Sequence, residues 1–190
     1  MKKIIALILC VLLSLTLYGC KKTTDNEVKE HSVDVEYYAK IGNIPEHKYQ
    51  LGADATEMEN KFKAEDEANN SEDSDTHNHS VYSLMEADDY SFLSYGNANY
   101  YFKKEKKIGC IVSLDTSYGF QIGALTVEVK EALNEFSAEE KQGNSDVLFF
   151  LPSAESYTYL EYTFGENNVI FAFQNSSLCA AMIYNPKNWN

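Results

Sequence analysis

The sequence contains no arginine, so all 16 of its basic residues are lysines. Arginine provides the planar pair of donors that recognises phosphate groups and guanine edges, and lysine replaces it poorly there. The chain also carries a net charge of −13, which repels a polyanion. We therefore exclude nucleic acid as a partner. We also expect any membrane attachment to depend on a feature other than the charge of the folded part.

Cysteine is scarce, and none of the four cysteines belongs to a C-x-x-C pair. Structural zinc sites of the ribbon type need such pairs, so this class of site is excluded. Cys110 and Cys179 lie outside the N-terminal region, and both have apolar neighbours. We predict that they are buried, reduced thiols. A disulfide is the alternative, because exported compartments permit oxidation.

Familiar catalytic motifs are also missing. The chain has neither the G-x-S-x-G nor the S-x-x-K pattern of serine nucleophiles. The sequence "GFQIG" at 119–123 lacks the following lysine of a phosphate-binding loop. His31 and His47 accompany no nucleophile in a motif. We therefore expect a protein that is not an enzyme and has no catalytic residues.

The longest apolar run, from Ile4 to Leu17, is shorter than the roughly 20 residues that span a bilayer as a helix. It follows Lys2 and Lys3, so residues 1–19 have the pattern of a secretory signal peptide. A retained membrane helix is the weaker alternative.

The signal pattern ends in Leu17-Tyr18-Gly19-Cys20, which resembles the bacterial lipobox, although Tyr18 departs from the usual small residue. The resemblance implies that cleavage makes Cys20 the mature N-terminus and that acyl chains are attached to its sulfur and amine. Two or more acyl chains hold a protein stably on a membrane. We expect a lipoprotein on the extracytoplasmic face of the cell membrane, with residues 20–47 as lipidated cysteine and tether. The alternative is an ordinary cleaved signal.

Two parts of the remaining chain have similar sequences. "YQLGADATEMENKF" (49–62) matches "FQIGALTVEVKEAL" (120–133), and "YSFLSYGNANYYF" (90–102) matches "YTYLEYTFGENNVIFAF" (157–173). The matches occur in the same order at a spacing of about 70 residues, which predicts a tandem repeat. The expected units are 48–115 and 116–190.

Each unit is expected to be a short helix region followed by an antiparallel sheet of three to four strands, which makes the fold class α+β. Asp54 is the predicted N-cap of the first helix, with Glu57 completing a capping box. The expected strands lie at about 81–85, 90–95, 99–104, 108–114, 147–151, 157–164, 168–174 and 178–184.

This repeated unit resembles the β-lactamase inhibitor protein family and the small lipoprotein of the outer-membrane barrel-assembly machinery. The resemblance covers about residues 48–184. It implies a non-enzymatic protein that binds a protein partner through loops or an aromatic-rich sheet face. The inhibitor family holds a disulfide in each unit, whereas this chain has one cysteine per unit.

Aromatic side chains are the main candidates for binding a protein of the envelope. In "YTYLEYTF", strand alternation places Tyr157 and Tyr159 on the face opposite Leu160 and the helices, and Tyr90 and Phe92 repeat the pattern. Exposed aromatic residues on a sheet form a good binding platform. The alternative is that loops or the neighbouring unit bury them.

The loop "EDEANNSEDSDTHNHS" (65–80) is the second candidate site. His77 and His79, with Asp75, carry ligand types suited to zinc. These residues predict an alternative function, a lipoprotein that binds a metal or small ligand through this loop. An acidic, solvated insertion without metal is the competing interpretation. No other cofactor is expected.

Overall fold

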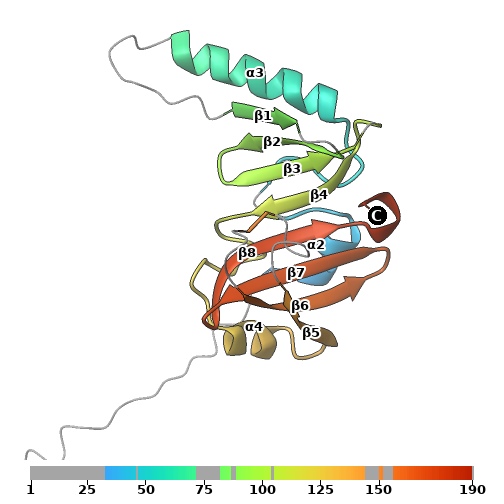
Figure 1. Ribbon diagram of the computed structural model, residues 1–190, viewed down its shortest axis with the longest axis vertical. Coiled ribbons are helices and arrows are strands. Elements are labelled where there is room, and N and C mark those ends of the chain that lie inside the picture. The colour runs from blue at the N-terminus through green and yellow to red at the C-terminus, as the bar shows by residue number, and fades with distance from the viewer. Residues whose placement is uncertain are drawn as a thin grey trace, which may run out of the picture. The chain divides into compact units, whose positions relative to one another are not determined.

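Eight strands form one antiparallel sheet in the computed structural model (Figure 1), which describes residues 33–45, 47–71, 82–86, 89–103, 105–143, 150–151 and 156–189. The order across the sheet is β1-β2-β3-β4-β8-β7-β6-β5. The strands are Tyr82–Glu86 (β1), Ser91–Tyr95 (β2), Ala98–Phe102 (β3), Ile108–Ser113 (β4), Ala138–Gly143 (β5), Tyr157–Phe164 (β6), Asn167–Gln174 (β7) and Ser177–Tyr184 (β8).

The prediction of two tandem α+β units is wrong, because the two groups of strands share a sheet. β4 pairs with β8 over four positions, with Ile111 opposite Ile183 and Val112 opposite Met182. In separate units, β4 and β8 would each present a row of unpaired backbone groups at a sheet edge. Their antiparallel pairing satisfies those groups and merges the halves into a mainly β fold.

Most of the expected strands are present. The exception is the strand expected at 147–151, because its two described residues are not in a strand. Phe150 and Leu151 lie in a turn and a bend, and residues 147–149 lie outside the described residues. The fifth strand is the charged segment 138–143 instead. Charged side chains suit an edge strand, and this segment lacks the apolar alternation from which strands are predicted.

The described helices are short, apart from one. They are Val35–Lys40 (α2), Ala55–Ser71 (α3), Thr126–Ala132 (α4) and Pro186–Trp189 (α5). Asp54 caps α3 as predicted, because its Oδ1 accepts hydrogen bonds from the backbone N–H groups of Thr56 (2.9 Å) and Glu57 (3.1 Å). Within the described ranges, no helix has the length and apolar character needed to cross a membrane.

Strand alternation gives the sheet two apolar faces. The helix-covered face carries Leu93, Tyr100 and Ile183, and residues of α2, α3 and α4 pack in the same core. Figure 1 shows α2 behind the sheet in that view. The second face carries its own buried cluster: Tyr101, Cys110, Val112, Leu151, Tyr157, Tyr159, Ile170, Ala172, Ala180 and Met182. A sheet buried on both faces explains why β4 is buried along its whole length.

The two cysteines lie in β4 and β8 and are not bridged. Cys110 is buried, as predicted, and burial raises the pKa of its thiol well above the ordinary value. Cys179 is only partly buried, so that part of the prediction is wrong. The antiparallel register places Tyr184, five positions from Cys179, opposite Cys110. Five positions along a strand span about 16 Å, which is beyond the reach of a disulfide.

Candidate functional site

The structure places the four predicted binding residues, Tyr90, Phe92, Tyr157 and Tyr159, on the second face of the sheet. They form two separate pairs there, because four strands lie between β2 and β6. The Phe92 and Tyr101 rings are stacked with centroids 5.1 Å apart, and the Tyr90 ring lies 5.7 Å from Tyr101. Strand alternation therefore predicted the correct face for the aromatic side chains.

The exposure of these residues differs from the prediction. Tyr157 and Tyr159 are only 3% and 6% exposed, whereas Tyr90 and Phe92 are half-buried. The alternative of burial is correct for the first pair, because the second face is packed rather than open. Leu151, in the connection between β5 and β6, is buried in the same cluster.

Trp189 of α5 joins the half-buried aromatic residues. A Cβ atom at Gly109 would lie 3.0 Å from Cε3 of Trp189, so the absent side chain makes room for the indole. The indole lies 6.0 Å from the Tyr90 ring and 6.1 Å from the Tyr101 ring, and Lys103 Nζ lies 5.5 Å from its centroid. Sequence reasoning missed Trp189. The signal that could have found it is that this residue is the single tryptophan of the chain and lies three positions after Pro186, the first residue of α5.

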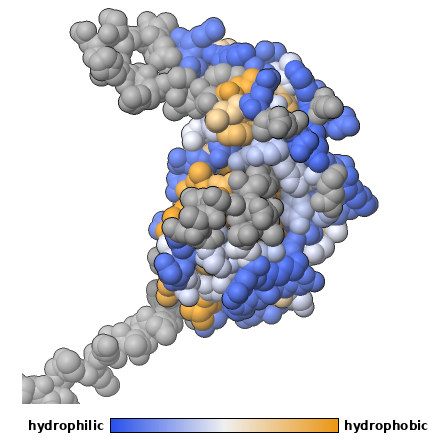
Figure 2. All heavy atoms as spheres, in the orientation of Figure 1, coloured by the Kyte–Doolittle hydropathy of each residue, from blue (hydrophilic) through white to orange (hydrophobic). Residues whose placement is uncertain are grey.

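Met85 extends this group toward the sheet edge. It lies opposite Phe92 in the β1–β2 register and is 54% exposed. We call Met85, Tyr90, Phe92 and Trp189 the aromatic surface. Figure 2 shows hydrophobic atoms exposed over the place where Figure 1 draws β1 and β2.

A carboxylate network lies on the same face, over β5 to β8. Glu161 accepts hydrogen bonds from Lys141 Nζ (2.6 Å), Asn168 Nδ2 (2.8 Å) and the Tyr184 hydroxyl (2.5 Å). Burial opposes the charge of Glu161, but these three donors outweigh it and lower its pKa. Burial and the bond to Glu161 raise the pKa of Tyr184 to about 12. The carboxylate is fully hydrogen-bonded, which indicates a structural role.

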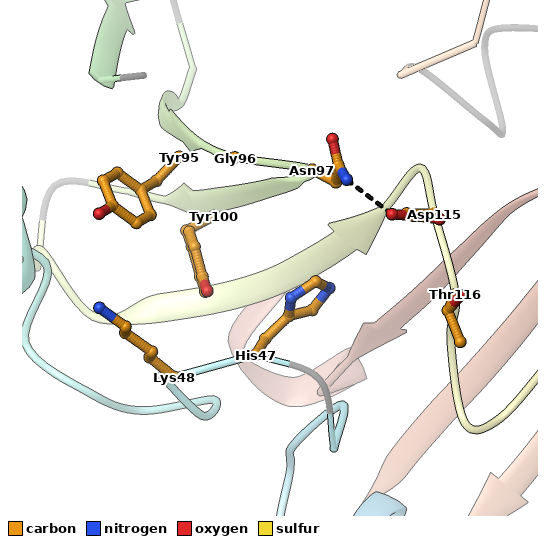
Figure 3. Close-up of a pocket in the computed structure, with 8 residues that line it drawn as sticks. All are labelled: His47, Lys48, Tyr95, Gly96, Asn97, Tyr100, Asp115 and Thr116. Atoms are coloured by element: carbon orange, nitrogen blue, oxygen red, sulfur yellow. Dashed lines mark hydrogen bonds between the residues drawn. The ribbon is translucent and has the colours of Figure 1, made fainter. Parts of the chain in front are cut away.

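A groove lies on the helix-covered face, between segments that are distant in the sequence (Figure 3). Its volume is about 380 Å³, which falls in the lower range for small-molecule sites. The lining residues are His47, Lys48, Tyr95, Gly96, Asn97, Tyr100, Asp115 and Thr116. They come from the segment before α3, from β2, the β2–β3 turn and β3, and from the loop after β4.

The two ends of the groove carry opposite charges. Lys48 lies at one end in Figure 3, and Asp115 lies at the other end. Lys48 Nζ bonds both carboxylate oxygens of Glu65, at 3.0 and 2.9 Å. The hydroxyl of Tyr95 donates to the same carboxylate at 2.6 Å. These bonds lower the pKa of Glu65, with the bond from Tyr95 as the largest cause, and raise the pKa of Lys48.

The other end of the groove holds Asp115 against a neutral partner. Asn97 Nδ2 donates to Asp115 Oδ2 at 2.6 Å. Between the two ends, the Tyr100 ring forms the floor and lies edge-on to the His47 ring, with centroids 6.3 Å apart. Burial raises the pKa of Tyr100 to about 12, so its hydroxyl stays neutral at physiological pH.

Other predicted site residues lie outside the described residues. These are the lipidation residue Cys20 and the candidate metal ligands Asp75, His77 and His79. The zinc prediction therefore stays a prediction. Within the described part of the chain, no group of three His, Cys, Asp or Glu side chains is placed to hold a metal ion.

Comparisons with known proteins return little. Neither a protein-family model nor a curated protein sequence matches the chain. Among solved structures, the chain is similar to the crystal structure of a DUF4309 family protein (YjgB) from Bacillus subtilis subsp. subtilis str. 168. It aligns with a TM-score of 0.49 and 10% identity, over 83% of this chain and 95% of that chain. Similarity at this level does not establish a shared function.

Proposed function

We propose that this chain is a lipid-anchored, extracytoplasmic binding protein that engages another protein of the cell envelope through the aromatic surface. The observation that carries the proposal is the group of half-buried aromatic rings continuous with the exposed Met85. Aromatic and methionine side chains are enriched at protein interfaces, and the aromatic rings bury a large area at modest cost in side-chain entropy. Tyr157 and Tyr159 are buried on β6, with four strands between it and β2, and are not part of this surface.

The surface suits a protein partner better than a small ligand. Its rings lie on β2, directly before β2 and on α5, and they do not line the groove described above. Lys103 adds a cation at its margin, 5.5 Å from the Trp189 centroid. A stiff apolar centre with a charged rim is the usual anatomy of an interface. The proposed activity is binding without catalysis.

The partner is tested by site-specific photo-crosslinking of the full chain in its native membrane. A crosslinker at Phe92 should capture one envelope protein, and a crosslinker at Val127 on α4 should not. Val127 is 52% exposed and lies away from the aromatic surface. The captured protein, once purified, should bind the chain directly, and Met85→Asp should weaken that binding about tenfold or more. Val127→Asp is the matched control. Equal loss in the two variants would contradict the proposal.

The lipid anchor is tested separately by metabolic labelling with a fatty-acid analogue. The motif at 17–20 implies that Cys20 carries the label, and Cys20→Ala should abolish it and leave the precursor uncleaved. Persistent label on the variant would refute the anchor but leave the aromatic surface untouched. The two halves of the proposal can therefore fail independently.

A further inference from the structure

The groove at Lys48 and Asp115 is separate from the aromatic surface, because Tyr95 and Tyr100 point from β2 and β3 toward the helix-covered face. Phe92 and Tyr101, in the same strands, belong to the second face. A ligand in the groove and a partner on the aromatic surface would thus bind opposite sides of the sheet. The proposed protein-binding function does not account for the groove.

One end of the groove shows how this protein holds an ammonium group. Lys48 Nζ lies 5.5 Å from the centroid of the Tyr95 ring and bonds the Glu65 carboxylate. An aromatic ring and a carboxylate together form a favourable site for an ammonium ion, through cation–π attraction and charge-assisted hydrogen bonds. In this half of the groove, the ammonium group of Lys48 occupies the site formed by Tyr95 and Glu65.

The other end also carries a carboxylate, that of Asp115, but no ammonium group. Asp115 bonds the amide of Asn97, and none of the lysine–carboxylate ion pairs among the described residues includes it. In Figure 3, the Tyr100 ring lies on the Lys48 side, and the His47 ring is drawn between it and Asp115. Asp115 is exposed, so its charge costs little to keep when the groove is empty.

The charges of the groove favour a cation over an anion. Lys48 is matched by Glu65, and Asp115 remains as the unmatched charge among the described carboxylates and lysines there. The whole chain carries a net charge of −13, which raises the local concentration of cations and lowers that of anions. A metal ion is disfavoured, because a stable site needs several ligands and Asp115 provides one carboxylate.

We propose that the groove binds a small organic cation whose ammonium group bonds Asp115 and whose carbon skeleton lies over Tyr100. The volume of about 380 Å³ accommodates a ligand of this class. The hydroxyl of Thr116 and the imidazole of His47 line the same end and offer polar contacts to substituents. Binding is reversible and involves no covalent step.

The test uses NMR titration of the full chain in detergent with choline, ethanolamine and the neutral choline isostere 3,3-dimethylbutan-1-ol. Choline and ethanolamine should shift the amide signals of Asn97, Tyr100 and Thr116. The neutral isostere should bind roughly tenfold more weakly, because it has the shape of choline without its charge. Absence of any shift with both ammonium probes overturns the proposal. Inorganic phosphate shifting these signals more strongly than choline also overturns it.

Two variants with matched controls separate the local site from the general charge of the chain. Asp115→Asn should weaken ammonium binding roughly tenfold or more, whereas Glu131→Gln, which removes an exposed charge on α4, should not. An equal effect of the two changes would show general electrostatic attraction only.

The second variant predicts a gain and does not depend on the Asn97–Asp115 contact. Lys48→Met removes the internal ammonium and leaves Glu65 and Tyr95 to accept the probe, so binding should tighten. Lys130→Met is the control, because it removes one positive charge and releases a carboxylate, that of Glu140, outside the groove. It should leave ammonium binding in the groove unchanged. Weaker or unchanged binding by Lys48→Met would contradict the assignment.

Discussion

At the scale of single residues, Gly109 shows how a missing side chain positions another residue. The space above this glycine is filled by the Trp189 indole, whose Cε3 would lie 3.0 Å from an added Cβ. Lys103 Nζ holds the end of α5 by donating to the Trp189 carbonyl at 2.7 Å. The Trp189 ring and this hydrogen bond both attach the C-terminal segment to the sheet.

Gly109→Val should expel the Trp189 indole from this position. The added methyl groups overlap the indole, and overpacking of this kind costs about 1–3 kcal/mol. Trp189 is the single tryptophan, so its fluorescence reports the change directly. Emission should shift to the red and become more accessible to quenchers. Thr163→Val, an exposed position on β6, is the control. Unchanged emission would mean that the indole does not depend on Gly109.

Glu161→Gln should destabilise the fold by about 1–2 kcal/mol at neutral pH, because it removes a charge-assisted acceptor whose partner Lys141 is partly exposed. The pKa of Glu161 is lowered in the folded state. Its contribution is therefore present above the unfolded value of about 4.3 and is lost as the pH falls through the lower folded value.

The measurement is the free energy of unfolding in urea as a function of pH. The native chain should lose more stability than the variant as the pH falls below about 4.3, and the two curves should converge in acid. Parallel curves would show that this network does not lower the pKa of Glu161 in the folded state.

At the scale of elements, Met58 and Phe62 pack α3 into the core of the helix-covered face. These two residues are four positions apart, which places them on one face of the helix, and both are fully buried. The Phe62 ring is stacked on Tyr95 with centroids 3.8 Å apart and lies edge-on to Tyr49 at 5.2 Å. The packing of Phe62 also positions Tyr95, which lines the groove.

Phe62→Ala should destabilise the fold by about 3–5 kcal/mol, because it removes a fully buried ring and leaves a cavity beneath α3. Lys61→Ala, the exposed neighbour on the same helix, should leave Tm nearly unchanged. Urea unfolding followed by circular dichroism measures both. A small effect of Phe62→Ala would indicate that α3 contributes little to the stability of the sheet.

At the scale of the whole molecule, the β4–β8 pairing decides whether there are one or two folding units. The two halves share a continuous hydrogen-bond ladder and a core that includes Leu93, Tyr100, Val169 and Ile183. Units that share a core and a sheet unfold together more readily than units joined by a linker.

Hydrogen exchange should therefore show one cooperative opening. Amides of β3 and β7 should have the same exchange free energy in mild denaturant and should lose protection together. Trp189 fluorescence and circular dichroism should give coincident transitions. Loss of protection in β2 and β3 at lower denaturant than in β6 and β7 would show two independent units.

The sequence by itself determined the features that depend on neighbouring residues. The alternation in "YTYLEYTF" determined which side chains share a face, because successive residues of a strand point to opposite sides. The Asp54 cap follows from one carboxylate placed before a helix. The β7–β8 turn follows from Asn175 and Ser176, both at positive φ. The charge and the absence of arginine are likewise properties of the sequence alone.

Only the tertiary structure decided which edges meet and what covers each face. Internal similarity cannot say whether two groups of strands stay apart or join, because backbone pairing is nearly independent of side-chain identity. Tyr157 is buried in a cluster that also contains Leu151, from the connection between β5 and β6, and the Trp189 indole occupies the space above Gly109, 80 positions earlier. The groove places Lys48, Asn97 and Asp115 together, and no local pattern relates them. Such long-range contacts are set by the packing of the whole chain, which is why the sequence left them undecided.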